Sequence, residues 1–225
     1  MPRAPEKTWG DRVSLSCEGL NNDGIGNTVV GGLTCGGTRA RARLRLLLCM
    51  LCASLAAGAA EVTQRTSSQT GLPIWTVRAG GLSLELAPQL PDFIQAVFTS
   101  RGIPQEAANL IAADCVFGTI VRNASEGVIS YTLADWRAVT SDGQAHPVKA
   151  KAAWVSRWRE LGVTFRWLLL PDEQTFNVGD WSQAFTTVEL PRDTGFDLHV
   201  SWSERGEQHR AIVEGLRCAP AKGPQ

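Results

Sequence analysis

Two histidines near the carboxyl end of the chain have the clearest capacity for chemistry. His199 and His209 lie on the two arms of an expected hairpin, and imidazole is a common ligand of copper and zinc. If Ser203 pairs with Gln208 across the turn, the two imidazoles project from opposite faces of the sheet. A one-residue bulge at Gly206 would bring them to one face. A periplasmic copper or zinc site at these histidines is therefore kept as an alternative.

Two cysteines define the one covalent cross-link that we expect. Of the six cysteines, only Cys115 and Cys218 lie beyond Ala60, where a cleaved export signal is expected to end. Two cysteines left in an oxidising compartment most simply pair, which predicts a disulfide closing a loop of about 100 residues. Both methionines lie upstream of Ala60. This weakens a Cu(I) site, because Cu(I) prefers thiolate and thioether ligands.

Residues 61–225 contain no familiar catalytic motif. The spacings HExxH, Gly-x-Ser-x-Gly, the P-loop and Gly-x-Gly-x-x-Gly are all absent from this part of the sequence. Asp172 and Glu173 are adjacent carboxylates, but they follow Pro171 in an expected loop, where a solvated turn is favoured over acid/base chemistry. The sequence therefore assigns no catalytic residue and no cofactor, and it favours a protein that is not an enzyme.

Tryptophan is the one residue type in excess, with eight in the chain. Trp154 and Trp158 fall on one stripe of a helix predicted over residues 149–161, and Arg157 and Arg159 lie beside that stripe. The pattern favours packing of the helix against the rest of the domain. The alternative is an exposed aromatic and basic face that binds a partner protein, an acidic ligand or lipid headgroups.

Export is the clearest functional signal in the sequence. Residues 39–60 begin with four arginines at alternate positions, continue with an apolar stretch and end in alanine and glycine. This order matches the three regions of a secretory signal peptide, with cleavage expected near Ala60. Residues 1–38 precede a signal that normally starts a protein. We therefore expect them to be disordered, or to reflect a start codon assigned too early.

Removal of the first 60 residues changes the charge of the chain. The whole sequence carries 22 basic and 22 acidic side chains, whereas residues 61–225 carry 15 basic and 18 acidic ones. This acidic balance argues against nucleic acid as a partner, because phosphate binding usually needs a basic excess. The length predicts a single exported domain over residues 61–225, periplasmic or secreted, without a transmembrane segment.

Local patterns predict a mainly β domain with about three inserted helices. The helices are expected over residues 91–101, 104–113 and 149–161. The strands are expected over residues 74–77, 82–86, 115–121, 128–133, 136–140, 163–170, 181–190, 196–203 and 208–216. Residues 115–121 and 128–133 are expected to form a hairpin, and residues 163–170 an apolar central strand. Residues 61–69 and 171–180 are expected to be a loose terminus and a loop.

A set of turn and strand signals spans residues 115–217. The signals are residues 121–125, 133–136, 141–143, 178–180 and 190–191, followed by a closing strand. They resemble the pattern of exported bacterial immunoglobulin-like domains of the immunoprotective extracellular type, although the helix at residues 149–161 departs from that plan. The resemblance implies an antiparallel immunoglobulin-like β-sandwich outside the cytoplasm, and it supplies no catalytic residues. We expect a non-catalytic binding or accessory domain of unknown ligand, with a periplasmic or envelope protein as partner.

Overall fold

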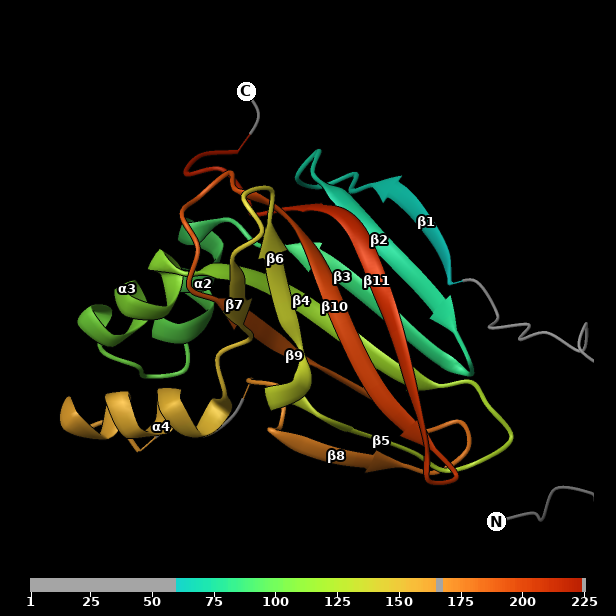
Figure 1. The fold of residues 1–225 in the computed structure, drawn as a ribbon. Helices are drawn as coiled ribbons and strands as arrows, with labels where there is room; N and C mark the ends of the chain where they lie inside the picture. Colours follow the sequence, from blue (N-terminus) through green and yellow to red (C-terminus); the bar gives the residue numbers. More distant parts are fainter. Residues whose placement is uncertain (1–59, 165–167, 224–225) are drawn as a thin grey trace, which may run out of the picture. The chain divides into compact units, whose positions relative to one another are not determined.

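Antiparallel pairing sorts the strands into two sheets (Figure 1). The structure is a computed structural model, and it describes residues 60–164 and 168–223. Sheet A contains, in spatial order, β1 (Glu61–Thr66), β2 (Pro73–Ala79), β3 (Leu82–Pro88), β4 (Cys115–Asn123) and β9 (Trp181–Val188). Sheet B contains, in spatial order, β7 (Ala145–Pro147), β6 (Arg137–Thr140), β10 (Gly195–Glu204), β5 (Ile129–Thr132) and β8 (Glu173–Phe176), with β11 (Glu207–Arg217) also paired to β10. The predicted mainly β, antiparallel, sandwich-like fold is confirmed.

The inner faces of the two sheets enclose one hydrophobic core. In β3, Leu82, Leu84 and Leu86 are buried whereas Ser83 and Glu85 are not, as the alternating sequence predicts. The matching buried residues of β10 are Phe196, Leu198, Val200 and Trp202. Each buried side chain of this size contributes about 1.5–3 kcal/mol. This core therefore holds the two sheets together.

A second, smaller core lies between the helices and part of the outer face of sheet A. The helices are α2 (Pro91–Thr99), α3 (Gln105–Ala113) and α4 (Lys151–Glu160), close to the predicted ranges. Phe98 and Trp158 meet in this core with ring centroids 5.5 Å apart. Val116 of β4 and Phe185 of β9 join the same cluster. Figure 1 shows the three helices gathered at one end of the sheets.

The predicted disulfide between Cys115 and Cys218 is confirmed. Cys115 is the first residue of β4 in sheet A, and Cys218 directly follows β11 in sheet B. Both residues are buried in the core between the sheets. The bond therefore joins the two sheets and closes a loop with a sequence separation of 103.

The predicted hairpin of residues 115–121 and 128–133 is wrong. β4 pairs with β3 and β9, whereas β5 pairs with β8 and β10, so the chain crosses from sheet A to sheet B between them. The side-chain amide of Asn123 donates to the carbonyls of Gly127 and Phe176 at 2.7 and 3.1 Å. These bonds tie the end of β4 to β8 in the other sheet. Asn123 therefore forms a corner between the sheets rather than a turn between neighbouring strands.

The apolar run over residues 163–170 does not form the predicted central strand in its described part. Leu169 makes one isolated parallel bridge to Phe185, and Leu168 has a left-handed φ of 70°. An apolar run predicts burial, but not by itself an extended conformation. The sequence also missed β1, β7 and β8. All six residues of β1 are exposed, so this edge strand carries no alternation of polar and apolar residues.

The predicted extension over residues 1–38 lies outside the described residues. The predicted signal peptide over residues 39–60 does so as well, except for Ala60. In residues 60–164 and 168–223, no helix combines the length and the apolar character that crossing a membrane requires.

Candidate functional site

His199 and His209 lie on opposite faces of sheet B. Trp202 pairs with His209 and Ile212 pairs with His199, which is the register expected when Ser203 pairs with Gln208. The ring of His209 stacks on Trp202 with centroids 5.5 Å apart. His199 is exposed on the outer face. The structure therefore does not bring the two imidazoles together as the copper or zinc alternative requires.

The hairpin has no bulge that would change this arrangement. Its register irregularity lies between Phe196 and Leu198, at the end of β10 away from Gly206. The described parts of the chain contain no cluster of three or more histidine, cysteine, aspartate or glutamate residues that could hold a metal ion.

Trp154 and Trp158 are buried, so the exposed aromatic face considered for the helix at residues 149–161 is wrong. The indole N–H of Trp154 donates to Thr187 Oγ1 of β9 at 2.8 Å. The indole N–H of Trp158 donates to the carbonyl of Ala107 in α3 at 3.3 Å. The stripe thus fixes α4 to sheet A and to α3, as the packing interpretation predicts.

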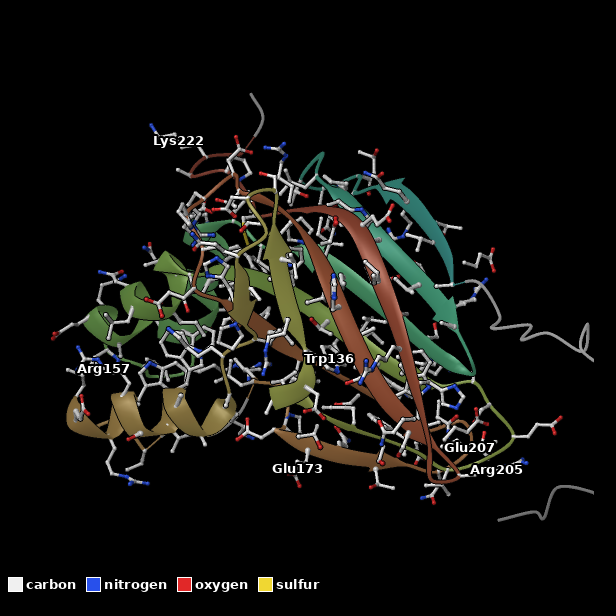
Figure 2. The ribbon with its side chains drawn as sticks, in the orientation of Figure 1. Trp136, Arg157, Glu173, Arg205, Glu207 and Lys222 are labelled. Atoms are coloured by element: carbon white, nitrogen blue, oxygen red, sulfur yellow. A yellow bond between two sulfur atoms is a disulfide. The ribbon has the colours of Figure 1, made fainter. Side chains whose placement is uncertain are left out.

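The two arginines beside that stripe remain exposed. Figure 2 shows Arg157 on α4, where its guanidinium pairs with Glu160 at 2.6 Å. Arg159 is also exposed and makes no ion pair within the described residues. Because the tryptophans are buried and do not belong to this surface, the two arginines form an ordinary charged helix surface.

The adjacent acids have separate structural positions. The Asp172 carboxylate accepts hydrogen bonds from the backbone N–H groups of Lys151 and Ala152 at 2.5 and 3.1 Å. It therefore caps the start of α4 and complements the helix dipole there. Glu173 is exposed in β8. Asp172 therefore has a structural role and does not lie in the solvated turn that the sequence favours.

Trp181 is the exposed tryptophan of the described chain. Its exposed fraction is 55%, whereas Trp75, Trp136, Trp154, Trp158 and Trp202 have exposed fractions between 0% and 4%. Its neighbour in the β8–β9 turn, Val178, is exposed by 59%. Large exposed apolar side chains that lie together often mark a binding surface.

Trp181 belongs to a row of side chains that crosses all five strands of sheet A. The strand register aligns Glu61, Arg78, Ser83, Arg122 and Trp181. A second row consists of Thr63, Thr76, Glu85, Ile120 and Gln183. Neighbouring side chains in each row are about 4.8 Å apart, because this is the spacing of strands in a sheet. We call these ten residues the tryptophan face.

The tryptophan face lies on the outer side of sheet A. The alternate residues Val77, Leu84 and Val121 are buried in the core between the sheets, so Arg78 and Arg122 project the other way. None of the ten residues is buried. The helices cover only the neighbouring part of this side, where Phe185 packs into the second core. No described residue buries the two rows.

The β8–β9 turn fixes the position of Trp181. Asp180 accepts a hydrogen bond from the backbone N–H of Asn177 at 2.9 Å, and the carbonyl of Asp180 accepts one from the N–H of Asn123. Trp181 itself pairs with Arg122 across the β4–β9 ladder. The indole is therefore presented by a rigid sheet and not by a loose loop.

The polar groups of the tryptophan face are largely available to a ligand. Glu85 pairs with Arg65 at 3.2 Å. Within the described residues, the side chains of Arg78, Arg122 and Gln183 make no hydrogen bond or ion pair. The face therefore combines one aromatic ring with unpaired donors and acceptors on an exposed sheet surface.

A second polar surface is a hollow on the outer face of sheet B. The hollow has a volume of about 710 Å³, and the polar residues around it are Asp135, Arg137, His199, Ser201, Gln208 and Arg210. We call it the sheet B hollow. Aspartate, histidine and serine occur together here, but no hydrogen bond joins Asp135, His199 and Ser201 in the described chain. The serine is thus not activated as it would be in a catalytic triad.

Sequence reasoning missed both surfaces. Alternation along a strand shows that one face is apolar but not whether a helix covers the other face, so the sequence does not reveal that Trp181 is exposed. The chain from Trp181 to Leu190 carries no signal of how far the helices extend over sheet A. Comparison of the chain with protein-family models, with curated proteins and with solved structures found no match.

Proposed function

We propose that residues 61–225 are an exported, non-catalytic binding domain whose tryptophan face takes a polysaccharide. The observation that carries this proposal is the exposure of Trp181 on an uncovered, polar sheet face while the other described tryptophans are buried. An exposed indole on a sheet offers a ligand a stacking surface that the buried indoles do not offer.

The chemistry of the face fits a sugar polymer. One side of a pyranose ring is lined with C–H groups and stacks on an aromatic ring, while its hydroxyls need donors and acceptors at the edge. Ser83, Thr76 and Gln183 supply both at the spacing of neighbouring strands. An open sheet face suits an extended chain better than a small molecule, which usually binds in a concave site.

The unpaired arginines of the face, rather than its net charge, favour an acidic polysaccharide, because its two arginines are matched by two glutamates. Arg78 and Arg122 flank Ser83 in the row that leads to Trp181. Guanidinium groups bind carboxylates through two parallel hydrogen bonds, which gives both attraction and orientation. Glu61 is the acidic residue of this row and lies on the edge strand β1. A sugar that stacks on Trp181 can therefore place its carboxylate on Arg122.

A protein partner from the periplasm or envelope is the second candidate for the same face. The combined exposure of Val178 and Trp181 favours it, because clustered exposed apolar side chains are typical of protein interfaces. The two candidates differ in two measurable ways: how strongly binding depends on charge, and whether a soluble glycan binds to the face.

Export to the periplasm or to the outside of the cell forms part of the proposal. The disulfide between Cys115 and Cys218 supports it, because such bonds persist in oxidising compartments. Mass spectrometry of the exported protein should find an amino terminus at Ala60 or Glu61, in which case β1 would begin at the mature end. An exported chain that retains residues 39–60 would contradict the cleavage.

An immunoglobulin-like topology is also proposed. Two facing antiparallel sheets, a buried tryptophan at Trp136 and a disulfide between the sheets support it. The insertion of α2 and α3 between β3 and β4 departs from that plan. An experimental structure with a different order of strands would contradict the proposed topology.

Binding assays with two polysaccharides test the proposed function. We expect the domain to bind polygalacturonate more tightly than the neutral polymer dextran, and Trp181→Ala to weaken binding of polygalacturonate about tenfold. Arg122→Gln should weaken binding of the acidic polymer and leave dextran binding unchanged. Phe93→Ala is the matched control, because Phe93 is an exposed aromatic residue on α2. Equal binding by wild type and Trp181→Ala would contradict the proposal and leave the protein partner as the candidate.

A further inference from the structure

The sheet B hollow exists because a short helical turn interrupts the pairing of β10. The edge of β10 pairs with β6 from Phe196 to His199 and with β5 at Ser203 and Glu204. Between these segments the chain forms the 3₁₀ turn η1 (Leu133–Asp135) and leaves the ladder. Residues 200–202 therefore have no strand on that edge.

A buried tryptophan fixes β10 beside the hollow. Trp136 follows η1 and is fully buried, and Figure 2 shows it near β6 and β10. Its indole N–H donates to the carbonyl of Ser201 at 3.0 Å, which satisfies a backbone group that the missing strand would have paired. The ring of Tyr131 packs on it with centroids 5.4 Å apart. The hollow is thus a built feature of the fold and not a gap between mobile loops.

Three side chains that can carry positive charge line the hollow. Arg137 pairs with His199 across the β6–β10 ladder, and Arg210 pairs with Ser201 across the β10–β11 ladder. These positions share the outer face of the sheet, so Arg210 is a diagonal neighbour of His199. Asp135 is the one carboxylate among the residues that line the hollow.

The three side chains differ in the hydrogen bonds that they make within the protein. The guanidinium of Arg137 donates through Nη1 to the carbonyls of Ala134 and Trp136, the second at 2.7 Å, so its position is fixed by the turn. Arg210 makes no hydrogen bond or ion pair within the described chain, and neither does the imidazole of His199. Asp135 forms no ion pair with either arginine in the same residues. The donors of Arg210, His199 and Ser201 are therefore free for a ligand.

We propose that the sheet B hollow is a second binding site, which takes the carboxylate or phosphate group of a small ligand. Arginine pairs with flat or tetrahedral oxyanions through two donors, and the Ser201 hydroxyl adds a third donor between Arg210 and His199. The volume of about 710 Å³ lies in the range of small-molecule sites and leaves room for more than the anionic group itself.

Asp135 restricts which anions fit. Its carboxylate repels a second negative group at that side of the hollow and accepts a hydrogen bond from a ligand donor. The preferred ligand therefore carries one oxyanion group and, next to it, a hydroxyl or an amine. This site lies on sheet B and is independent of the polysaccharide proposed for sheet A.

Titration with inorganic phosphate and, separately, with acetate at constant ionic strength tests the site. We expect the ring resonances of His199 in NMR spectra to shift with at least one probe, while those of His146 and His209 stay unchanged. The probe that binds more tightly identifies the oxyanion class. A common shift of all three histidines, or no shift with either probe, would overturn the proposal.

Matched variants locate the bound anion. Arg210→Gln should weaken binding about tenfold, whereas Arg159→Gln, the same change on the exposed surface of α4, should leave it unchanged. Arg210→Lys keeps the positive charge but lacks the two parallel donors of arginine, so it should weaken anion binding by an intermediate amount. This variant replaces Arg210→Gln as the test if Arg210→Gln does not fold. Loss of anion binding in Arg122→Gln, with Arg210→Gln unaffected, would place the anion on sheet A and refute the hollow.

Discussion

Asn123 determines how the chain passes from one sheet to the other. Its side chain is 1% exposed, and it donates to two carbonyls while its own oxygen accepts from the N–H of Ser125 at 2.9 Å. The sequence places Asn123 in an ordinary turn, since asparagine favours turns through bonds to its own backbone. That local signal is correct, but the bond to Phe176 is not visible in the sequence because Phe176 lies 53 residues away.

Replacement of this amide should destabilise the whole domain. We expect Asn123→Ala to lower the free energy of unfolding by about 2–4 kcal/mol, because the carbonyl of Phe176 would lose this donor and the carbonyl of Gly127 would keep only the Ser125 hydroxyl. Denaturation with urea measures the loss. Asn109→Ala, at an exposed position of α3, is the control and should change stability by less than about 0.5 kcal/mol. A similar small effect at Asn123 would mean that water replaces the amide.

Asp114 is a buried carboxylate at the junction of α3 and β4. Lys149 Nζ lies 3.0 Å from Asp114 Oδ2, and Lys149 also pairs with Glu189 at 3.3 Å. Burial raises the pKa of Asp114 above its ordinary value of 3.8, whereas Lys149 acts in the opposite direction and compensates in part. Glu189 adds to the rise of this pKa, and Arg192 lowers it.

The raised pKa of Asp114 predicts a specific pH dependence. Because the folded pKa exceeds the unfolded one, the protonated carboxyl contributes stability fully below pH 3.8, and this contribution is lost as the pH rises through the folded pKa. Asp114→Asn mimics the protonated form. Its free energy of unfolding relative to wild type should therefore increase between about pH 3 and pH 7. Asp92→Asn, at an exposed position, is the control. A difference that falls over this range would show that the ion pair with Lys149 outweighs burial.

At the scale of elements, α4 shows what a hydrophobic stripe can and cannot predict. Trp154 and Trp158 were correctly placed on one side of a helix, and the packing interpretation of that side is confirmed. The partner of the stripe could not be read from the sequence, because it consists of α3 and the outer face of β9. The Asp172 cap was equally hidden, since it comes from a residue beyond the end of the helix.

Replacement of Trp158 tests how much the packing of α4 contributes to the stability of the domain. We expect Trp158→Ala to lower the free energy of unfolding by about 3–5 kcal/mol, because a fully buried side chain is lost from the second core. Arg157→Ala, on the exposed side of the same helix, should cost less than about 0.5 kcal/mol. Thermal or chemical unfolding of both variants makes the comparison. Equal, small effects would indicate that α4 does not depend on this packing.

The strands were predictable to the extent that one of their faces is buried. β3 and β5 were located from the alternation of apolar and polar residues, β4 from its apolar and β-branched run, and the two helices before β4 from their opening prolines. Of the three strands that were missed, β1 is exposed on both sides, β7 has no buried residue, and β8 is short and buries only Phe176. The tryptophan face was missed for a different reason. The exposure of Trp181 depends on where the helices stop covering sheet A, and the strand's own sequence does not show this.

At the largest scale, the described residues 60–164 and 168–223 present two polar surfaces on the outer sides of their two sheets. The tryptophan face lies on sheet A beyond the part covered by the helices, and the sheet B hollow lies where η1 interrupts the ladder of β10. The Cys115–Cys218 bond joins the sheets, so both surfaces belong to one covalently fixed body. The two surfaces can therefore be tested separately by variants that leave the shared core intact.

NMR of the indole N–H groups during titration with an oligogalacturonate tests the proposed function most directly. The proposal predicts that the indole resonance of Trp181 shifts and saturates, together with backbone amides of β4 and β9, while the indole resonances of Trp75, Trp136, Trp154, Trp158 and Trp202 stay in place. The same titration of Trp181→Ala should show no saturating shift. A saturating response confined to β10 and β11, or no response at any tryptophan, would contradict binding at the tryptophan face.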